Sequence, residues 1–573
     1  MAEVIISPGV FQQETDQSLY ATSPQVVGTA IVGPTVLGVP FVPTYVTTYS
    51  QFQTLYGDIF KSGSYYYEYF TSMAAREYFN NGGRTLLVTR VISGSANVST
   101  YATSSATTIS GSNVNLTNGA TSSVVFETLA WGDLQNNSGS QVSGALDSGS
   151  IYNVRYEITN VDTGSGQFTV LVRRGDDNAG LKNVLETWSN VCLDPQLPNF
   201  ISRVIGDFKP VPDVTAGTVT VTGSFTNQSR YIRVKSVNVI ADSIDNNGNF
   251  KVANTGSLPA NQSGSFTGGV AATTDVALMN EAVTTTNIQG FGPTDYTNGI
   301  NMITDKEGVQ FNVLLVPGVG LDVTAVANKA ITTVENRGDS IAILDAGKYN
   351  TPINTAVSNA ATQQSSYGAT YYPWVKLFSP GLGKSVWCPP STVIGGVLAF
   401  NDSVTAEWFA PAGLNRGGVP SVVSTERRLP QTDRDTLYVG RVNPIANFPG
   451  VGTAVWGQKT LQKKASSLDR VNVRRLMIAL KGFIGNVART LVFEQNTTAT
   501  RNRFLAQVNP YLSSVVQRQG LYAYKVVMDD TNNTPDVVDR NQLVGQIYIQ
   551  PTKTAEFIIL NFNILPTGAT FPA

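Results

Sequence analysis

Few residues of this 573-residue chain have the side chains and the spacing that catalysis needs. The chain contains no histidine, and Cys192 and Cys388 are its two cysteines. The missing histidine excludes Ser-His-Asp and Cys-His catalysis as well as zinc bound by histidine. Two distant cysteines provide neither a disulfide framework nor a thiolate cage for a metal. No spacing of paired acids predicts a pocket for carboxylate chemistry, so an enzyme of that kind stays a weak alternative.

Phosphate binding is a second candidate, because the GKS at 383–385 matches the end of a phosphate-binding loop. The full pattern needs a glycine where Phe378 stands and a helix after the serine, whereas CPP follows at 388–390. The GVG at 318–320 likewise lacks the third glycine of a dinucleotide fingerprint. The RGD at 337–339 fits a helix that ends at Gly338 better than a cell-attachment site. We therefore expect no cofactor and no metal.

Positive charge is concentrated near the carboxyl end. Residues 459–525 hold twelve Lys and Arg against Asp469 and Glu494, in a chain of formal net charge −1. At 100° per residue, one side of a helix collects the apolar residues Val473, Met477, Leu480, Ile484, Val487 and Leu491. The basic residues of the same helix fall on the other flank: Arg470, Arg474, Arg475, Lys481 and Arg489. A solvated face, a nucleic-acid surface and a contact with an acidic protein all stay open.

The rest of the chain predicts alternating strands and helices. We expect a strand in VVGTAIVG (26–33), a helix in SYYYEYFTSMAAREYFNNGG (64–83) and a strand in RTLLVTRVI (84–92). FNVLLVPGVG (311–320), a helix over 324–336 and SIAILDAG (340–347) predict a βαβ unit with a right-handed crossover. After the basic helix, a second helical stretch is expected to break at Asn509-Pro510.

The predicted fold class is α+β, in several domains. Between the two α/β stretches the composition changes to Ser, Thr, Gly and Asn with short strands, which is typical of inserted all-β modules. We expect an N-terminal arm at 1–23, an α/β middle domain from 24–94 plus 287–390, and a β-rich insertion at 95–286. A C-terminal α+β domain at 391–565 and a tail at 566–573 complete the chain.

Both ends of the chain contain strand-like apolar runs. The N-terminal run holds Val4, Ile5, Ile6, Val10 and Phe11. Near the other end, AEFIILNFNIL at 555–565 includes Phe557, Ile558, Ile559 and Leu560, and is apolar on both faces. Such a strand must be covered or paired, either within one subunit or in the sheet of a neighbour.

Bulk composition excludes several partners. Charged residues make up 14% of the chain, a low share that suits protein stacking on protein or an exposed β-rich adhesin. The small net charge gives no field that would attract nucleic acid or acidic lipid. MAEVIISPGVF lacks the basic region of a secretory signal, and prolines interrupt the uncharged stretch from 17 to 57. We expect a soluble protein made in a cytoplasm, with no membrane insertion.

Several segments resemble contractile phage tail sheath proteins. In the first part these are SPGVFQQE, VVGTAIVGPTVLGVPFVPTYVTTYSQFQTLYG and YFNNGGRTLLVTRV. YYPWVKL, PPSTVIGGVLAFND, EWFAPAGLNRG, VNPIANFPG and AVWGQKTL resemble the most characteristic stretch of the family. VNVRRLMIALKGFI, LVFEQN and IYIQPTKTAEFIIL resemble its C-terminal domain. The resemblance covers about 7–94 and 287–565 in a consistent order, and leaves 95–286 outside.

The resemblance implies a structural protein that is not an enzyme. Sheath subunits of this family polymerise as stacked hexameric rings around a tail tube, between a baseplate and a tail terminator, and contract without nucleotide hydrolysis. The expected location is the virion tail, after assembly in the host cytoplasm. The runs Val4 to Ile6 or Val10-Phe11, and 557–560, are then the links between subunits. The basic patch expected to face the tube comprises Arg470, Arg474, Arg475, Lys481, Arg489, Arg501 and Arg503.

Other interpretations stay open. A sheath of a bacterial contractile injection system or of a tail-like bacteriocin fits the same segments. A β-rich surface adhesin accounts for 95–286, but not for the basic helical part or the missing export signal.

Overall fold

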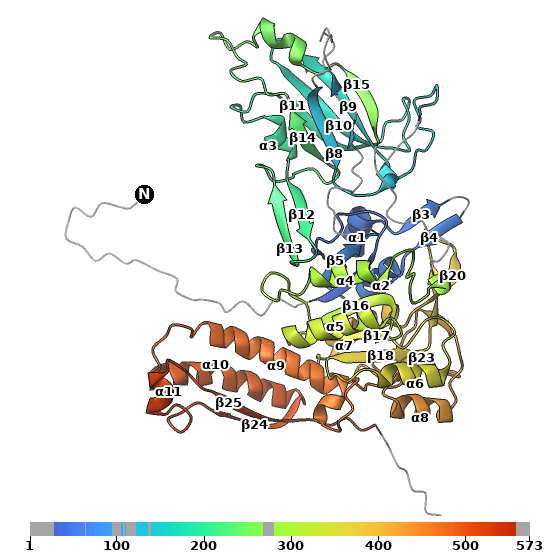
Figure 1. Ribbon diagram of the computed structural model, residues 1–573, viewed down its shortest axis with the longest axis vertical. Helices are drawn as coiled ribbons and strands as arrows, with labels where there is room; N and C mark the ends of the chain where they lie inside the picture. Colours follow the sequence, from blue (N-terminus) through green and yellow to red (C-terminus); the bar gives the residue numbers. More distant parts are fainter. Residues whose placement is uncertain are drawn as a thin grey trace, which may run out of the picture.

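The computed structural model describes residues 28–62, 65–93, 105–106, 109–110, 122–135, 139–267 and 280–556. Three parts are visible along the molecule (Figure 1). An α/β body lies in the middle and is built on one large sheet. A β-rich distal unit, within residues 105–267, lies at one end. A C-terminal unit, residues 471–551, extends beside the other end of the body.

The body is organised by an eight-stranded sheet in which six central strands run parallel and the edge strands β2 and β23 run antiparallel. In spatial order the strands are β2 (Thr44–Val46), β5 (Leu86–Val91), β1 (Thr29–Pro34), β16 (Val313–Gly320), β17 (Ile341–Asp345), β18 (Gly368–Tyr372), β22 (Asn443–Phe448) and β23 (Gly452–Val455). Residues 391–455 of the predicted 391–565 domain belong to this body, because β22 pairs with β18 and continues its sheet.

Helices cover both faces of the sheet. The helices of the body are α1 (Tyr49–Tyr56), α2 (Phe70–Asn80), α4 (Pro293–Asn301), α5 (Thr324–Arg337), α6 (Ile353–Ala361), α7 (Ser391–Val404) and α8 (Gln431–Val439). In β1, Val32 faces Gly299 of α4, whereas its neighbour Gly33 faces Thr71 of α2, which places the two helices on opposite faces. A Cβ at Gly33 would lie 2.4 Å from Thr71 Oγ1, so this close approach requires glycine.

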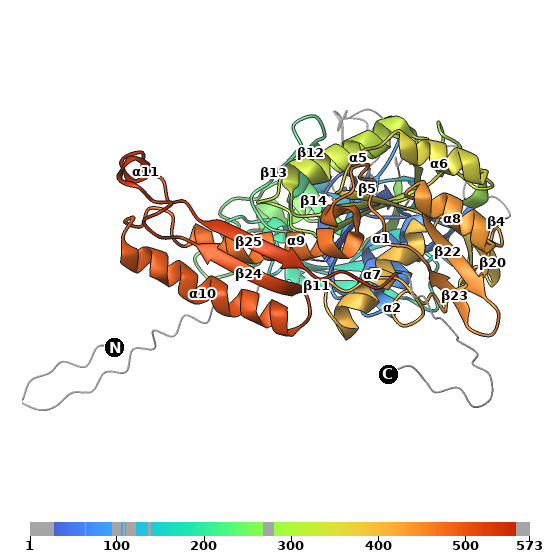
Figure 2. The same cartoon turned by 90° about the horizontal axis from the view of Figure 1, so that it is seen from below.

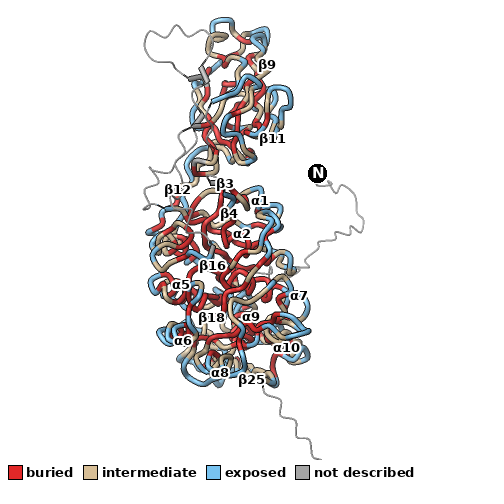
Figure 3. The backbone as a smooth tube through the Cα atoms, turned by 90° about the vertical axis from the view of Figure 1, so that its right-hand side faces the viewer, coloured by how far each residue is buried: buried red, intermediate tan, exposed pale blue. Residues whose placement is uncertain are grey.

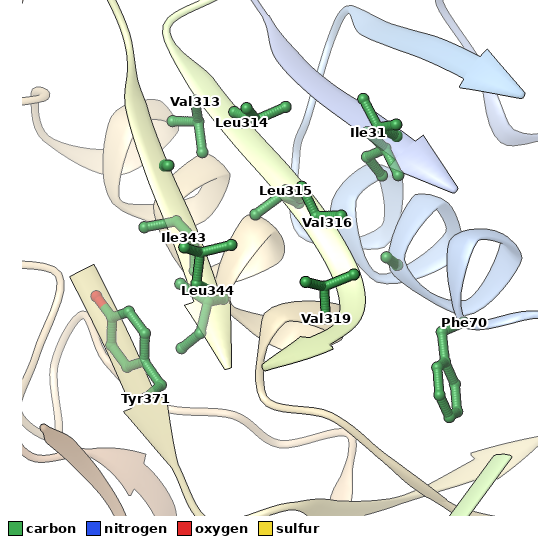
Figure 4. Close-up of a cluster of buried hydrophobic side chains, with 14 of the residues drawn as sticks. Ile31, Phe70, Val313, Leu314, Leu315, Val316, Val319, Ile343, Leu344 and Tyr371 are labelled. Carbon is green, nitrogen blue, oxygen red and sulfur yellow. The ribbon is translucent and has the colours of Figure 1, made fainter. Parts of the chain in front are cut away.

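Because both faces are covered, the central strands read as continuous buried runs of aliphatic residues. Ile31, Leu315, Ile343 and Tyr371 are all within 1% of complete burial and come from four neighbouring strands (Figure 4). This core fixes the positions of the loops and helices on which the C-terminal unit rests.

Two of the sequence motifs prove to be turns. Gly338 ends α5 in the left-handed conformation, at φ 71°, and β16, α5 and β17 form the predicted βαβ unit. The GKS at 383–385 lies in a hairpin between β19 (Val375–Ser379) and β20 (Lys384–Cys388), and β21 (Val422–Thr425) pairs with β19. The motif leads directly into strand β20 and not into a helix, as expected.

The helix predicted over 64–83 is wrong at its beginning. Residues Tyr65–Glu68 form strand β4, which pairs with β3 (Ile59–Ser62), and α2 begins only at Phe70. Three consecutive tyrosines favour a strand, and the neighbouring β3 supplies the partner. The helical spacing of the apolar residues extends toward the N-terminus into Tyr65–Glu68, but these residues pair with β3 instead.

The distal unit is a second sheet with its own core. Its strands are β6 (Ser105–Ala106), β7 (Ile109–Ser110), β8 (Ser122–Thr128), β9 (Val154–Asp162), β10 (Gln167–Arg174), β11 (Val184–Val191), β14 (Ile232–Val237) and β15 (Gln262–Thr267), with the short helix α3 (Ile201–Ile205). A hairpin of β12 (Lys209–Asp213) and β13 (Thr218–Thr222) lies between this unit and the body. Figure 3 shows separate buried interiors in the body and in the distal unit.

The C-terminal unit packs two helices against a two-stranded ribbon. Its elements are α9 (Val471–Arg489), α10 (Thr498–Gln517), β24 (Leu521–Val527), α11 (Pro535–Asp539) and β25 (Gln546–Pro551). The break predicted at Asn509-Pro510 is wrong, because α10 continues through Pro510. The pyrrolidine ring is on the exposed side, where a missing backbone donor is tolerated. The α+β fold class is confirmed.

Candidate assembly interface

Helix α9 is the first element of the C-terminal unit, and its first turns contact the body. Most of its predicted apolar stripe is confirmed, since Val473, Leu480 and Val487, with Leu491 just beyond the helix, are at most 8% exposed, whereas Met477 and Ile484 are half-buried. Leu480, Val487 and Leu491 belong to the hydrophobic cluster that also contains side chains of α10 and the ribbon. The first turns of α9 also lie against the α/β body, so that this half of the helix is covered on a second side.

Arg475 makes one of these contacts with the body. Its guanidinium donates to both carboxylate oxygens of Asp402 in α7, and its side chain is 3% exposed. Burial alone would lower the pKa of Arg475, but the charge and hydrogen bonds of Asp402 outweigh it and raise the pKa. The pair therefore joins the C-terminal unit to the body through a charged contact within the molecule.

Arg474 makes a similar contact beside it. Its Nε donates to the carbonyl oxygen of Ser366 at 3.2 Å, and its Nη2 contacts the Ser366 hydroxyl. The guanidinium also lies 3.9 Å from the ring centre of Tyr367. Burial lowers the pKa of Arg474, with Tyr367 opposing the shift.

The predicted exposed basic flank is therefore corrected at three positions. Arg474, Arg475 and Arg501 are at most 6% exposed and face partners in the same chain. Arg501 pairs with Asp530, and its Nε donates to Asn496 at 2.9 Å. The physical reason is that the body and the loop after β24 each cover a helix face that the periodicity alone leaves open to solvent.

The other four cations of the predicted patch are more accessible. Lys481, Arg489 and Arg503 are exposed, and Arg503 makes only a loose contact with Glu494 at 3.7 Å. Lys481 donates to the hydroxyl of Tyr367 at 3.2 Å. Arg470 is half-buried and pairs with Asp469 and Glu556. The structure thus leaves three exposed positive groups on α9 and α10.

The ribbon of β24 and β25 has a covered face and an exposed face. Tyr524 and Val526, with Ile547 and Ile549 opposite them, pack toward the helices, and Figure 2 shows the ribbon lying along α10. Tyr548 on the other face is 56% exposed. Among the residues that the structure describes, β24 and β25 pair only with each other, so both outer edges have backbone donors and acceptors for another strand.

The predicted linking residues lie outside the described part of the chain. This concerns Val4, Ile5, Ile6, Val10, Phe11, Phe557, Ile558, Ile559 and Leu560. The last described residue, Glu556, follows β25 after a short connection from Thr552.

A groove that the sequence did not reveal lies where the C-terminal unit meets the body. Its volume is about 1220 Å³, and its walls include Trp408, Tyr438, Phe448 and Trp456. Phe448 and Trp456 are in ring contact, with centroids 4.4 Å apart. The available signal was the aromatic residues in EWFAPAGLNRG and AVWGQKTL, which stand beside Gly and Pro and so favour exposed loops.

The described residues contain no group of three or more acidic, cysteine or histidine side chains arranged to hold a metal ion. Within the same residues, none of the helices combines the length and the apolar character that a bilayer-crossing segment needs.

Comparison with known proteins places these features in a family. Residues 289–461 match the phage tail sheath protein central domain, and residues 463–565 match the phage tail sheath C-terminal domain. The tail sheath protein of Vibrio phage KVP40 is 32% identical over 310 residues, 49% of this chain and 46% of the relative. That of Enterobacteria phage T4 is 40% identical over 185 residues, 32% of this chain and 28% of the relative.

The chain thus spans less than half the length of these curated relatives. The crystal structure of the sheath tail protein Lin1278 from Listeria innocua has the same fold, with a TM-score of 0.50, 11% identity, and coverage of 92% of this chain and 96% of that one. The residues that match the C-terminal domain of the family include α9, α10 and the ribbon, the elements of the candidate interface. The central and C-terminal domains of this chain, residues 289–461 and 463–565, belong to the phage tail sheath protein family.

Proposed function

We propose that this chain is the structural subunit of a contractile phage tail sheath and not an enzyme. Subunits stack as hexameric rings around the tail tube, and the polymer contracts to drive the tube through the host envelope. Family membership supports this function, and both reported curated relatives are tail sheath proteins of phages. The observation that carries the assembly part is the ribbon of β24 and β25, whose outer edges are unpaired within the described residues.

Linkage between subunits occurs by strand addition to this ribbon. The donors are the runs Val4 to Ile6 or Val10-Phe11 of one neighbour and residues 557–560 of another. Each added backbone hydrogen bond contributes about 0.5–1.5 kcal/mol net, so a short strand holds firmly only when several bonds form together. Strands shared between neighbouring subunits keep the polymer continuous while the rings rotate.

Contact with the tube uses the exposed cations that remain on the C-terminal helices. Lys481, Arg489 and Arg503 face solvent in the subunit and suit an acidic partner surface. Exposed ion pairs are worth about 0–1 kcal/mol each, so a small set is strong enough to guide assembly and weak enough to release on contraction. Baseplate and terminator proteins complete the set of partners, and the assembled protein resides in the virion tail.

Electron microscopy of the purified full chain tests this function. We expect hollow cylinders of uniform diameter with six-fold symmetry at raised protein concentration, because the linking strands are part of the chain itself. A chain that stays monomeric at high concentration, with and without tail tubes, contradicts the proposal.

A further inference from the structure

The carboxylate of Glu556 accepts four side-chain hydrogen bonds, although the residue lies outside the helices and strands. Its Oε1 accepts from Arg470 Nε at 2.7 Å and from Gln458 Nε2 at 3.2 Å. Its Oε2 accepts from the hydroxyl of Tyr438 at 2.6 Å and from Arg470 Nη2 at 2.9 Å. Only 18% of its side chain is exposed. We refer to Glu556, Arg470, Tyr438 and Gln458 as the Glu556 cluster.

The cluster joins separate parts of the molecule. Tyr438 lies in α8 of the body, Gln458 lies in the loop after β23, and Arg470 directly precedes α9. Gln458 Nε2 also donates to the hydroxyl of Thr554 at 2.7 Å. The connection from β25 to Glu556 is therefore tied to the body as well as to the first residue before α9.

Electrostatics keep the carboxylate of Glu556 ionised. Burial would raise the pKa of Glu556, but the hydrogen bonds from Arg470 and Tyr438 outweigh it and hold the pKa below its usual value. Burial, followed by the hydrogen bond to and the charge of Glu556, raises the pKa of Tyr438, so its hydroxyl stays protonated and donates. Charge-assisted hydrogen bonds of this kind are stronger than neutral ones.

Packing alone does not fix this connection. Thr552, Lys553, Thr554 and Glu556 line both the groove of about 1220 Å³ and a second hollow of about 440 Å³. The connection thus borders two hollows, and polar contacts at Thr552, Thr554 and Glu556 support it. The Glu556 cluster is the last of these supports before the segment 557–565.

We propose that the Glu556 cluster is the anchor through which the C-terminal linking strand is attached to the rest of the subunit. This inference rests on the proposed function, in which residues 557–560 pair with a second copy of the chain. Tension on such a strand would otherwise act on the end of β25 and separate it from β24 one backbone bond at a time. With the anchor in place, the tension passes from Glu556 into α8 and the base of α9. The ribbon stays intact.

Hydrogen exchange of the β25 amides, measured in monomers and in assembled polymers, tests the anchor. Glu556→Gln keeps the shape of the side chain and removes its charge. We expect about tenfold faster exchange of residues 546–551 in polymers of this variant, and about a tenfold higher concentration for polymer formation. Exchange in the monomer should change little, because no tension acts there.

Two further variants complete the experiment. Glu494→Gln is the matched control, since it removes an exposed carboxylate of the same unit, and it should behave like the wild type. Tyr438→Phe deletes a single hydrogen bond of the cluster and should give the same effects in weaker form. It keeps the test possible if Glu556→Gln folds poorly. Wild-type exchange and assembly in both cluster variants overturn the anchor while leaving the sheath function intact. Failure of the wild type itself to polymerise refutes the proposed function instead.

Discussion

The guanidinium of Arg475 in α9 and the carboxylate of Asp402 in α7 form a two-point ion pair across the junction of the C-terminal unit and the body, with Nη1 2.8 Å from Oδ1. Arg474 crosses the same junction through Ser366. Glu556, which Arg470 holds, crosses it through the hydroxyl of Tyr438 in α8. The start of α9 is thus a polar joint within the subunit. Its stability determines whether the two parts move as one body.

Replacing Asp402 by Asn should weaken this joint. The substitution leaves a buried guanidinium without its carboxylate, and the partial exposure of Asp402 reduces the cost to about 1–3 kcal/mol of the free energy of unfolding. Urea unfolding of the monomer measures it. Asp530→Asn is the control, because that carboxylate is 88% exposed and its loss should cost less. Equal effects of the two substitutions would contradict a special role for the joint.

The exposed cations should affect tube binding without affecting folding. Changing Lys481, Arg489 and Arg503 to Gln should leave monomer stability within about 0.5 kcal/mol of the wild type, as is usual for surface changes. Cosedimentation with tail tubes should weaken, and its dependence on salt should become shallower, because fewer ion pairs are screened.

A second triple variant controls for net charge. Lys61→Gln, Lys306→Gln and Lys384→Gln remove three exposed cations from the body, far along the chain from α9 and α10. Tube binding of this control should match the wild type. If both triples bind tubes as the wild type does, the cations of α9 and α10 do not face the tube.

Asp345 should make stability depend on pH. It lies at the end of β17, is 1% exposed, and accepts hydrogen bonds from the backbone and hydroxyl of Ser391, each at 2.8 Å. Burial raises its pKa to about 7. Between about pH 4, where an unfolded Asp titrates, and pH 7, the folded state binds more protons, so stability falls as the pH rises.

Asp345→Asn removes this titrating group. The fall in the free energy of unfolding with rising pH should then become shallower, by at most about 1.4 kcal/mol per pH unit. Unfolding curves at several pH values between 4 and 7 measure the difference in slope between variant and wild type. Asp435→Asn, at an exposed position of α8, should keep the wild-type slope. Identical slopes for all three proteins would show that Asp345 is already ionised throughout this range.

The N-terminal arm should be needed for assembly but not for folding. Deleting residues 1–18 removes none of the described core, so the monomer should keep its thermal stability while cylinders are lost. The single change Ile5→Pro should also reduce polymerisation, because proline removes a backbone donor that strand pairing uses. Ile5→Val keeps the donor and the β-propensity and serves as the control. Normal cylinders from the deletion would exclude the arm as a link.

The sequence predicts those elements whose pattern is decided locally. The strand at 311–320, the helix over 324–336 and the end of that helix at Gly338 are confirmed because burial on both faces, helical spacing and a glycine stop agree there. The apolar stripe of α9 is confirmed for the same reason. Each of these signals depends on residues close together in the chain.

The rest depends on partners that are distant in sequence. Periodicity places Arg474 and Arg475 opposite the apolar stripe of their own helix, but it cannot show that Ser366 and Asp402 cover that side. Tyr65 to Glu68 become a strand only because β3 pairs with them. The Glu556 cluster combines residues 438, 458, 470 and 556, which no local pattern connects.

The hydrophobic clusters of the distal unit and of the body share no residue among those described. An amino-acid change in the interior of one unit therefore acts mainly on the packing of that unit, and reaches the other through residues at their border such as Tyr152. Evolution is free to exchange or enlarge the distal unit at little risk to the lattice. For the same reason, it is the natural position at which to graft a reporter or a display peptide onto this subunit.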